Sequence, residues 1–154
     1  MEANKRQVGG EHYMVHPNGI SHWDYCVQAQ VPYLEGCASK YVSRWRKKNG
    51  LQDLEKAVHY IEKRIESVHK KEGSFSSVRR KDGLFNRFIN DNKIPLRERN
   101  VIDNIMHWRR LDQLHEAHAT LCEMIREYHE PVQSVNVTTF VDDATCDYNP
   151  NQDR

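Results

Sequence analysis

A regular apolar seam in the middle of the chain constrains the fold more than any other feature. Six apolar residues follow one another at spacings of 3, 4, 3, 4 and 3: Leu51, Leu54, Val58, Ile61, Ile65 and Val68. Residues three and four apart lie on the same side of an α-helix, so the seam predicts a helix over 51–70 that packs against another. Asn49-Gly50 breaks the helix predicted over 32–48. We expect these two helices to form an antiparallel pair.

A shorter helix is predicted before this pair. Ser21 can cap a helix over about 22–30, because its hydroxyl can accept a hydrogen bond from the first turn. The predicted buried side of that helix is formed by Trp23, Cys26 and Val27. Residues 1–18 have no helical pattern. The first helical unit therefore spans 1–72.

A second helical unit is predicted after a linker at 73–83. The linker is rich in Gly and Ser and has no apolar periodicity. Three apolar stretches follow the linker, and each predicts a helix: one contains Leu84, one begins after Pro95 and one contains Leu114. The second unit is therefore expected at 84–129. Helix signals stop at Glu130, so 130–154 is expected to be an extended or disordered tail, with one strand conceivable near its start. The expected fold class is all-α.

The second unit resembles the first at an offset of 63 residues. Val31-Pro32 then aligns with Ile94-Pro95, and four further residues find counterparts: Val42, Trp45, Arg46 and Lys47 meet Ile105, Trp108, Arg109 and Arg110. A loop shortened by three residues pairs Leu54 and Ala57 with Leu114 and Ala117. A degenerate duplication and a coincidental alignment of apolar helices both explain this match. If the duplication is real, Asp103 stands where the first unit has Lys40, and a site at Lys40 survives only in the first copy.

Charge and cysteine content limit the function classes. The net charge is +1, which gives no global attraction to DNA, although 13 Lys or Arg residues and 6 Asp or Glu residues lie between Lys40 and Asp82. The four cysteines show no CxxC spacing and are expected to be reduced thiols. No apolar run approaches a membrane span, and the first residues show no signal-peptide core. The expected location is the cytoplasm.

Three cations on the predicted 32–48 helix could bind phosphate. Lys40, Arg44 and Lys47 lie at i, i+4 and i+7, which would put them on one exposed face. An arginine can also grip a phosphate through two hydrogen bonds. The alternative is a solvated basic surface. The chain has no P-loop motif and no dinucleotide fingerprint, so side chains would have to supply the phosphate contacts.

Further candidates lie on either side of these cations. Asp53 opens the next helix, where it could stabilise the helix terminus, hold Arg44 or Lys40, or bind a metal. Lys56 could contact phosphate, and Tyr60 could stack on a base or fill the helix interface. Upstream, His12 and Tyr13 follow Gly9-Gly10 in a non-helical segment. There His12 could act as a general acid or base or bind phosphate, or could hold the loop by a structural hydrogen bond.

The spacing and identity of these residues resemble those of a small family of proteins encoded by tailed phages. The matching positions, over about residues 8–68, are His12-Tyr13, Gly36, Lys40-Tyr41, Arg44, Lys47-Lys48, Asp53-Leu54, Lys56-Ala57 and Tyr60. The family consists mostly of proteins of unknown function and includes a coliphage deoxynucleoside monophosphate kinase. Cys37 and Arg46 depart from its usual Asn and Gly. The resemblance implies a helical nucleotide-binding protein with ATP or another nucleoside triphosphate as phosphate donor, in the cytoplasm of a host cell.

The leading hypothesis is therefore a kinase-like enzyme in which His12, Lys40 and Arg44 are catalytic. The substrate-binding residues would be Tyr13, Lys47, Asp53, Lys56 and Tyr60. One alternative is a binding protein that sequesters a nucleotide or a nucleotide-derived signal, or that blocks a host protein. Another is a nucleic-acid-binding accessory protein. No metal site is predicted. A homo-oligomer is expected, because Tyr41, Val42 and Trp45 cannot all face one helix.

Overall fold

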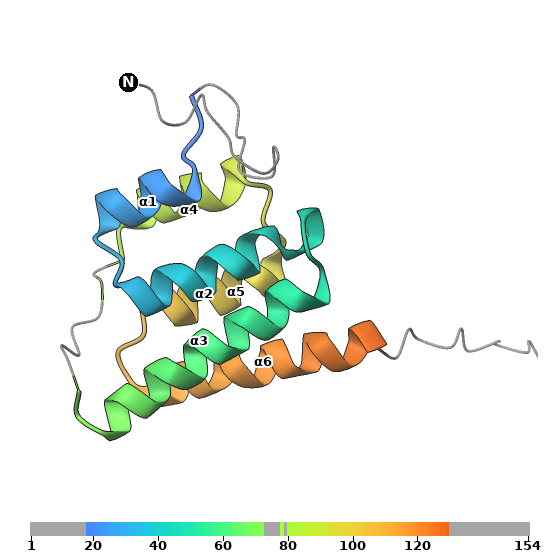
Figure 1. The fold of residues 1–154 in the computed structure, drawn as a ribbon. Helices are drawn as coiled ribbons and strands as arrows, with labels where there is room; N and C mark the ends of the chain where they lie inside the picture. The colour runs from blue at the N-terminus through green and yellow to red at the C-terminus, as the bar shows by residue number, and fades with distance from the viewer. Residues whose placement is uncertain (1–17, 73–77, 79, 130–154) are drawn as a thin grey trace, which may run out of the picture.

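A computed structural model describes residues 18–72, 78 and 80–129, and the regular secondary structure within them is helical (Figure 1). These residues form six α-helices: α1 His22–Ala29, α2 Tyr33–Arg44, α3 Leu51–His69, α4 Asp82–Asp91, α5 Leu96–Met106 and α6 Leu111–His129. A short 3₁₀ turn, Trp45–Lys47, follows α2. The predicted all-α class is confirmed. The predictions for the N-terminal segment, most of the linker and the tail concern residues outside the described ranges.

Local sequence signals explain where the first helices begin and end. Ser21 caps α1 as predicted: its hydroxyl accepts from the Asp24 amide at 3.2 Å, and the Asp24 carboxylate accepts from the Ser21 amide at 3.1 Å. The helix ends at Gln30 in the left-handed conformation, with φ of 56°. Between α2 and α3, Gly50 takes φ of 53° and ψ of −126°, which a glycine adopts without strain. A side chain at Gly50 would also meet the Tyr128 hydroxyl at 3.2 Å.

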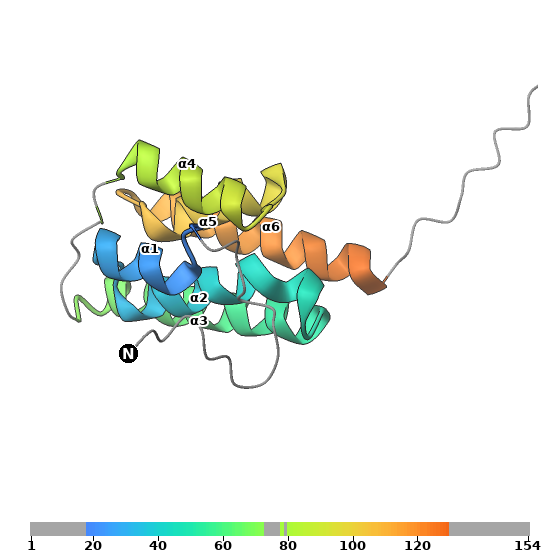
Figure 2. The same cartoon turned by 90° about the horizontal axis from the view of Figure 1, so that it is seen from above.

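The two units repeat one three-helix arrangement. Pro32 precedes α2 and Pro95 precedes α5, 63 residues later, and both have the same extended conformation. The residues two positions before these prolines, Gln30 and Lys93, both have positive φ. The helices α1, α2 and α3 lie in one layer and α4, α5 and α6 in the other (Figure 2). The shared cap and turn positions favour duplication over coincidence.

Counterpart residues meet in one core that both units share. Leu54 of α3 and Leu114 of α6 are 0% and 1% exposed, as the seam and the repeat predict. Tyr25 of α1 stacks on its counterpart Phe88 of α4, with ring centroids 5.0 Å apart and planes at 23°. Val42 is 1% exposed within the same core, so the second unit covers part of the apolar surface that motivated the expected oligomer.

Two of the three residues predicted on the buried side of α1 are wrong, whereas the third, Cys26, packs partly buried against the core. Val27 is 77% exposed and Trp23 is 49% exposed, whereas Tyr25 is fully buried. The reason is a pair of long-range contacts: the Tyr25 ring stacks on Phe88, and its hydroxyl lies 2.8 Å from His107 Nε2. These contacts orient α1 so that Tyr25 faces the core, while Trp23 and Val27 face the solvent.

Two crossed hydrogen bonds join the units. Trp45 donates its indole N–H to Glu98 of the second unit at 3.0 Å, and Trp108 donates to Glu35 of the first unit, also at 3.0 Å. The two tryptophans are counterparts, as are the two glutamates. Each carboxylate also pairs with an arginine: Glu35 with Arg64 at 2.7 Å and Glu98 with Arg46 at 2.8 Å. Because Glu35 and Glu98 are 2% and 1% exposed, these partners are what allows them to be buried.

None of the helices described by the structure combines the length and the apolar character that crossing a bilayer requires.

The crossed bonds predict a stability cost for loss of one indole N–H. Trp108→Phe keeps an aromatic ring but leaves the buried Glu35 carboxylate without that donor, so it should lower the free energy of unfolding by about 1.5–3 kcal/mol. Urea unfolding measures the change. Leu96→Ala on α5, the helix that precedes Trp108, is the control, since Leu96 is 69% exposed and its loss should change stability little. Equal effects of the two substitutions would contradict a stabilising role for the Trp108–Glu35 bond.

Candidate functional site

The candidate site is built around Tyr41, on the outward side of α2 next to α3. The Tyr60 ring of α3 stacks on the Tyr41 ring, with centroids 5.8 Å apart and planes at 21°. Three cations lie near the Tyr41 ring centroid: Lys40 Nζ at 4.9 Å, Arg44 Cζ at 4.8 Å and Lys56 Nζ at 5.6 Å. We call these five residues the Tyr41 cluster. Cations are drawn to the electron-rich faces of aromatic rings, so the cluster combines positive charge with a flat apolar surface.

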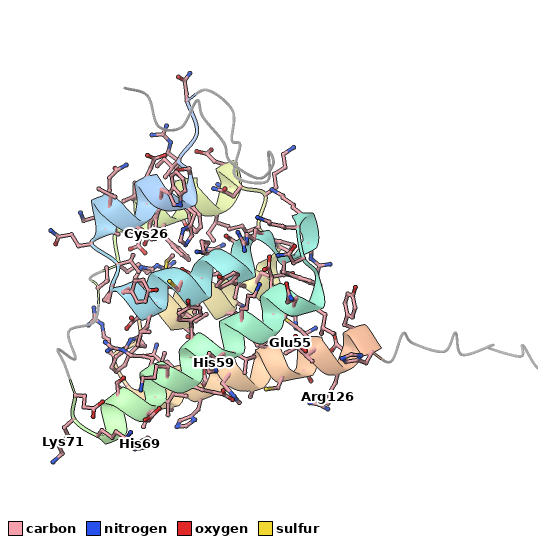
Figure 3. All side chains as sticks on the ribbon, viewed as in Figure 1. Cys26, Glu55, His59, His69, Lys71 and Arg126 are labelled. Carbon is pink, nitrogen blue, oxygen red and sulfur yellow. The ribbon has the colours of Figure 1, made fainter. Side chains whose placement is uncertain are left out.

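An open cavity of about 430 Å³ adjoins the cluster. It is lined by Tyr41, Gln52, Glu55, Lys56, His59 and Tyr60. Glu55 and His59 lie on α3, one helical turn apart (Figure 3). The volume falls within the range of small-molecule sites, which usually combine aromatic walls with a few polar groups. The cavity therefore offers two tyrosine rings together with a carboxylate, an amide, an imidazole and an ammonium group.

Tyr33, the first residue of α2, extends the aromatic surface formed by Tyr41 and Tyr60. Its ring is 73% exposed and meets the Tyr60 ring at 6.4 Å, edge to face. A hydrogen bond with Tyr33, together with partial burial, raises the pKa of Tyr60 to about 12. Tyr60 therefore keeps its hydroxyl proton at neutral pH and can serve as a hydrogen-bond donor.

Arg44 is a buried ion-pair partner rather than an exposed cation. Its Nε and Nη2 donate to the two carboxylate oxygens of Asp53 at 3.0 and 3.2 Å, and Asp53 is fully buried. Asn49 adds a third donor to Asp53, at 3.3 Å. Of the roles considered for Asp53, the structure shows the one in which it holds Arg44. The forked face of the guanidinium is thus turned to Asp53, and the expectation of an exposed Arg44 is wrong.

The structure does not bring Lys47 to the cluster. Regular helix ends at Arg44 and tightens into the 3₁₀ turn, so the predicted i+7 position does not continue the face. Lys47 instead donates to the Asn92 carbonyl oxygen of the second unit at 3.1 Å. The cluster thus contains Lys40, Arg44, Lys56 and Tyr60 from the predicted set, with Asp53 behind Arg44. His12 and Tyr13 fall outside the described residues.

Three residues of the cavity were missed from the sequence. Gln52, Glu55 and His59 share an exposed face of α3, and their spacing of three and four residues around Lys56 was the available signal. The residues described by the structure contain no group of three or more side chains arranged to hold a metal ion.

His22 of α1 is a buried histidine close enough to Lys40 and Arg44 to be affected by their charges. His22 Nε2 is 3.0 Å from the Ser39 hydroxyl oxygen, and that hydroxyl donates to the Glu35 carbonyl at 2.7 Å. Burial, with smaller effects from the charges of Lys40 and Arg44, lowers the pKa of His22 to about 3. His22 is therefore uncharged at neutral pH, and its Nε2–H donates to Ser39.

Comparison with known families bears on this part of the chain. Residues 9–62 match the model of DUF3310, a family described as of unknown function. The match includes all five residues of the Tyr41 cluster and ends before the second unit. No curated protein and no solved structure matches the chain.

The Arg44–Asp53 geometry predicts that Arg44 supports the fold. Arg44→Ala leaves the fully buried Asp53 carboxylate without its main partner, which should cost about 3–5 kcal/mol of unfolding free energy. Urea unfolding of the variant tests this. Lys47→Ala is the matched control, because this exposed side chain should contribute less than about 0.5 kcal/mol. If Arg44→Ala is as stable as Lys47→Ala, the pair does not stabilise the fold.

The pKa of His22 predicts a contribution to acid sensitivity. The folded-state pKa, about 3, lies below the ordinary value of 6.5, so the unfolded chain takes up the proton first. The stability conferred by neutral His22 is present above about pH 6.5 and is lost as the pH falls toward 3. Between pH 7 and pH 5 the parent should lose about 2 kcal/mol more than His22→Gln, measured from urea midpoints at both pH values. Equal losses would contradict a neutral His22.

Proposed function

We propose that this chain binds a nucleotide at the Tyr41 cluster. The observation that carries the proposal is the pair of stacked tyrosines with three cations around one ring, beside a cavity of about 430 Å³. Bases stack on aromatic side chains, and phosphates are attracted to lysine and arginine. A nucleotide is a small molecule that presents both groups to one site.

The geometry favours a division of roles within the cluster. The Tyr60 ring lines the cavity, so it is the surface on which a base would stack. Lys40 and Lys56 carry ammonium groups that would contact the phosphate as point charges. Arg44, held by Asp53, would act through its fixed charge near Tyr41. This arrangement differs from the bidentate Arg44–phosphate contact expected from the sequence.

We further propose that the bound nucleotide is the acceptor in a kinase reaction. The similarity to the tailed-phage family with a deoxynucleoside monophosphate kinase supports this activity. A terminal phosphoryl group would pass from ATP, or another nucleoside triphosphate, to a phosphate oxygen of the deoxynucleoside monophosphate. The donor and the acceptor would both leave as nucleoside diphosphates. Because such transfer depends on positioning and charge stabilisation, Lys40 and Lys56 would neutralise the reacting phosphates. The reaction would take place in the cytoplasm of a phage-infected cell.

A binding protein without catalysis is the second candidate. The commitment of the Arg44 fork to Asp53 favours it, because that fork is then not turned toward a transferring phosphoryl group. In this case the protein would sequester a nucleotide or a nucleotide-derived signal. A phosphate-transfer assay with ATP and each deoxynucleoside monophosphate separates the candidates: product formation supports the kinase, and tight binding without product supports sequestration. Assembly into a homo-oligomer stays a prediction for light scattering.

The proposed stacking surface predicts the effect of a conservative substitution. Tyr60→Leu keeps an apolar contact with Tyr41 but removes the ring, so it should lose the about 1–3 kcal/mol of base stacking, which is about 5- to 150-fold in affinity. Calorimetric titration with the four deoxynucleoside monophosphates measures this. Lys63→Ala, on the same helix but outside the cluster, should bind like the parent. If neither the parent nor Lys63→Ala binds any of the four, or if Tyr60→Leu binds like the parent, the proposed site is wrong.

A further inference from the structure

The second unit contains a counterpart of the Tyr41 cluster with different side chains. Asn104 of α5 occupies the position of Tyr41, and Glu116 of α6 occupies the position of Lys56. The two counterparts also touch, as the originals do: Asn104 Nδ2 donates to Glu116 Oε2 at 3.2 Å. The duplicated backbone thus brings the same two positions together in both units, and only the side chains differ.

The charge of the counterpart is reversed. Asp103 stands at the position of Lys40 and His107 at the position of Arg44, and the His107 ring lies 2.7 Å from the Asp103 carboxylate. Arg80 also pairs with Asp103, at 2.9 Å. With Glu116 in place of Lys56, two carboxylates stand where the first unit has two ammonium groups. Phosphate would meet like charge there, which opposes binding.

The stacking surface is lost as well. Thr120 occupies the position of Tyr60, so both rings of the stacked pair have been replaced by small polar side chains. A cavity of about 200 Å³ adjoins Asn104, but it is not the counterpart of the 430 Å³ cavity, because Glu116 and Thr120 do not line it. Its lining includes Asp103, Asn104 and His107, which are the counterparts of Lys40, Tyr41 and Arg44. The frame of a site is present, but its recognition groups are not.

We infer that the chain is a fused pseudo-dimer that binds one nucleotide, in the first unit only, and that three side-chain exchanges would create a second site. This inference rests on the proposed function of the Tyr41 cluster. The second unit supplies 13 of the 21 buried hydrophobic residues that the structure describes in the shared core, and it retains the backbone of the site. The groups missing from the second unit are two aromatic rings and the charges of Lys40, Arg44 and Lys56. Asn104→Tyr, Glu116→Lys and Thr120→Tyr would restore the two rings and the Lys56 ammonium. None of these three positions is buried, so the exchanges leave the core unchanged.

Calorimetric stoichiometry tests the inference with the four deoxynucleoside monophosphates as probes. The parent should bind one molecule per chain, and the N104Y/E116K/T120Y variant should bind two. The new site should be about 10- to 150-fold weaker, because Asp103 stays and one charge-assisted phosphate contact is missing. One molecule per chain in the folded triple variant, or two in the parent, would overturn the inference while leaving the nucleotide proposal intact. A parent that binds none of the probes would overturn the nucleotide proposal itself.

The reciprocal exchange gives an independent test. The Y41N/K56E/Y60T variant carries in the first unit the residues that the second unit already accommodates at the same backbone positions. It should fold, as judged by helical circular dichroism and its melting temperature, and it should bind none of the probes. Residual binding at parental affinity would place the site outside the Tyr41 cluster and overturn the inference. This test decides the question if the triple variant of the second unit does not fold.

Discussion

Two buried carboxylates, Glu35 and Glu98, impose the constraint on which the rest of the structure depends. A charged group removed from water is stable only when it is paired and hydrogen-bonded, and each of these carboxylates receives its indole donor from the other unit. Either unit alone would leave its own carboxylate without that donor. The crossed Trp–Glu bonds therefore fix the register of α2 against α5. Each unit depends on the other for its stability.

This constraint also shapes the candidate site. Trp45 reaches Glu98 from the 3₁₀ turn that follows α2, and Lys47 in the same turn reaches the second unit at Asn92. Arg44, the last residue of α2, faces α3 and pairs with Asp53. Tyr41, one turn earlier, stays at the surface between Lys40 and Lys56. The residues at the end of α2 thus contact the second unit and α3. The cluster lies one turn earlier, on the outward face of α2.

The sequence predicts features that are recognisable from local signals and regular spacing along the chain. The Leu51–Val68 seam, the Ser21 cap and the 63-residue offset all depend on spacing along the chain, and the structure contains all three. The orientation of α1 could not be read in this way, because Tyr25 is buried by a residue 82 positions away, His107, and by Phe88. The burial of Arg44 was missed for a related reason: spacing places a cation on a helix face but does not say which carboxylate, here Asp53, lies opposite.

Duplication within one chain permits an asymmetry that two identical chains cannot have. In a dimer of identical three-helix units, every substitution at the position of Tyr41 would appear twice, once in each site. A fused chain can keep Glu35, Glu98 and both tryptophans, which hold the units together, while the position of Tyr41 becomes Asn104 in one unit alone. The positions that differ most in charge, Lys40 against Asp103 and Lys56 against Glu116, lie outside the shared core, where such changes cost little stability. The fold thus separates the residues that join the units from the residues proposed to bind a nucleotide.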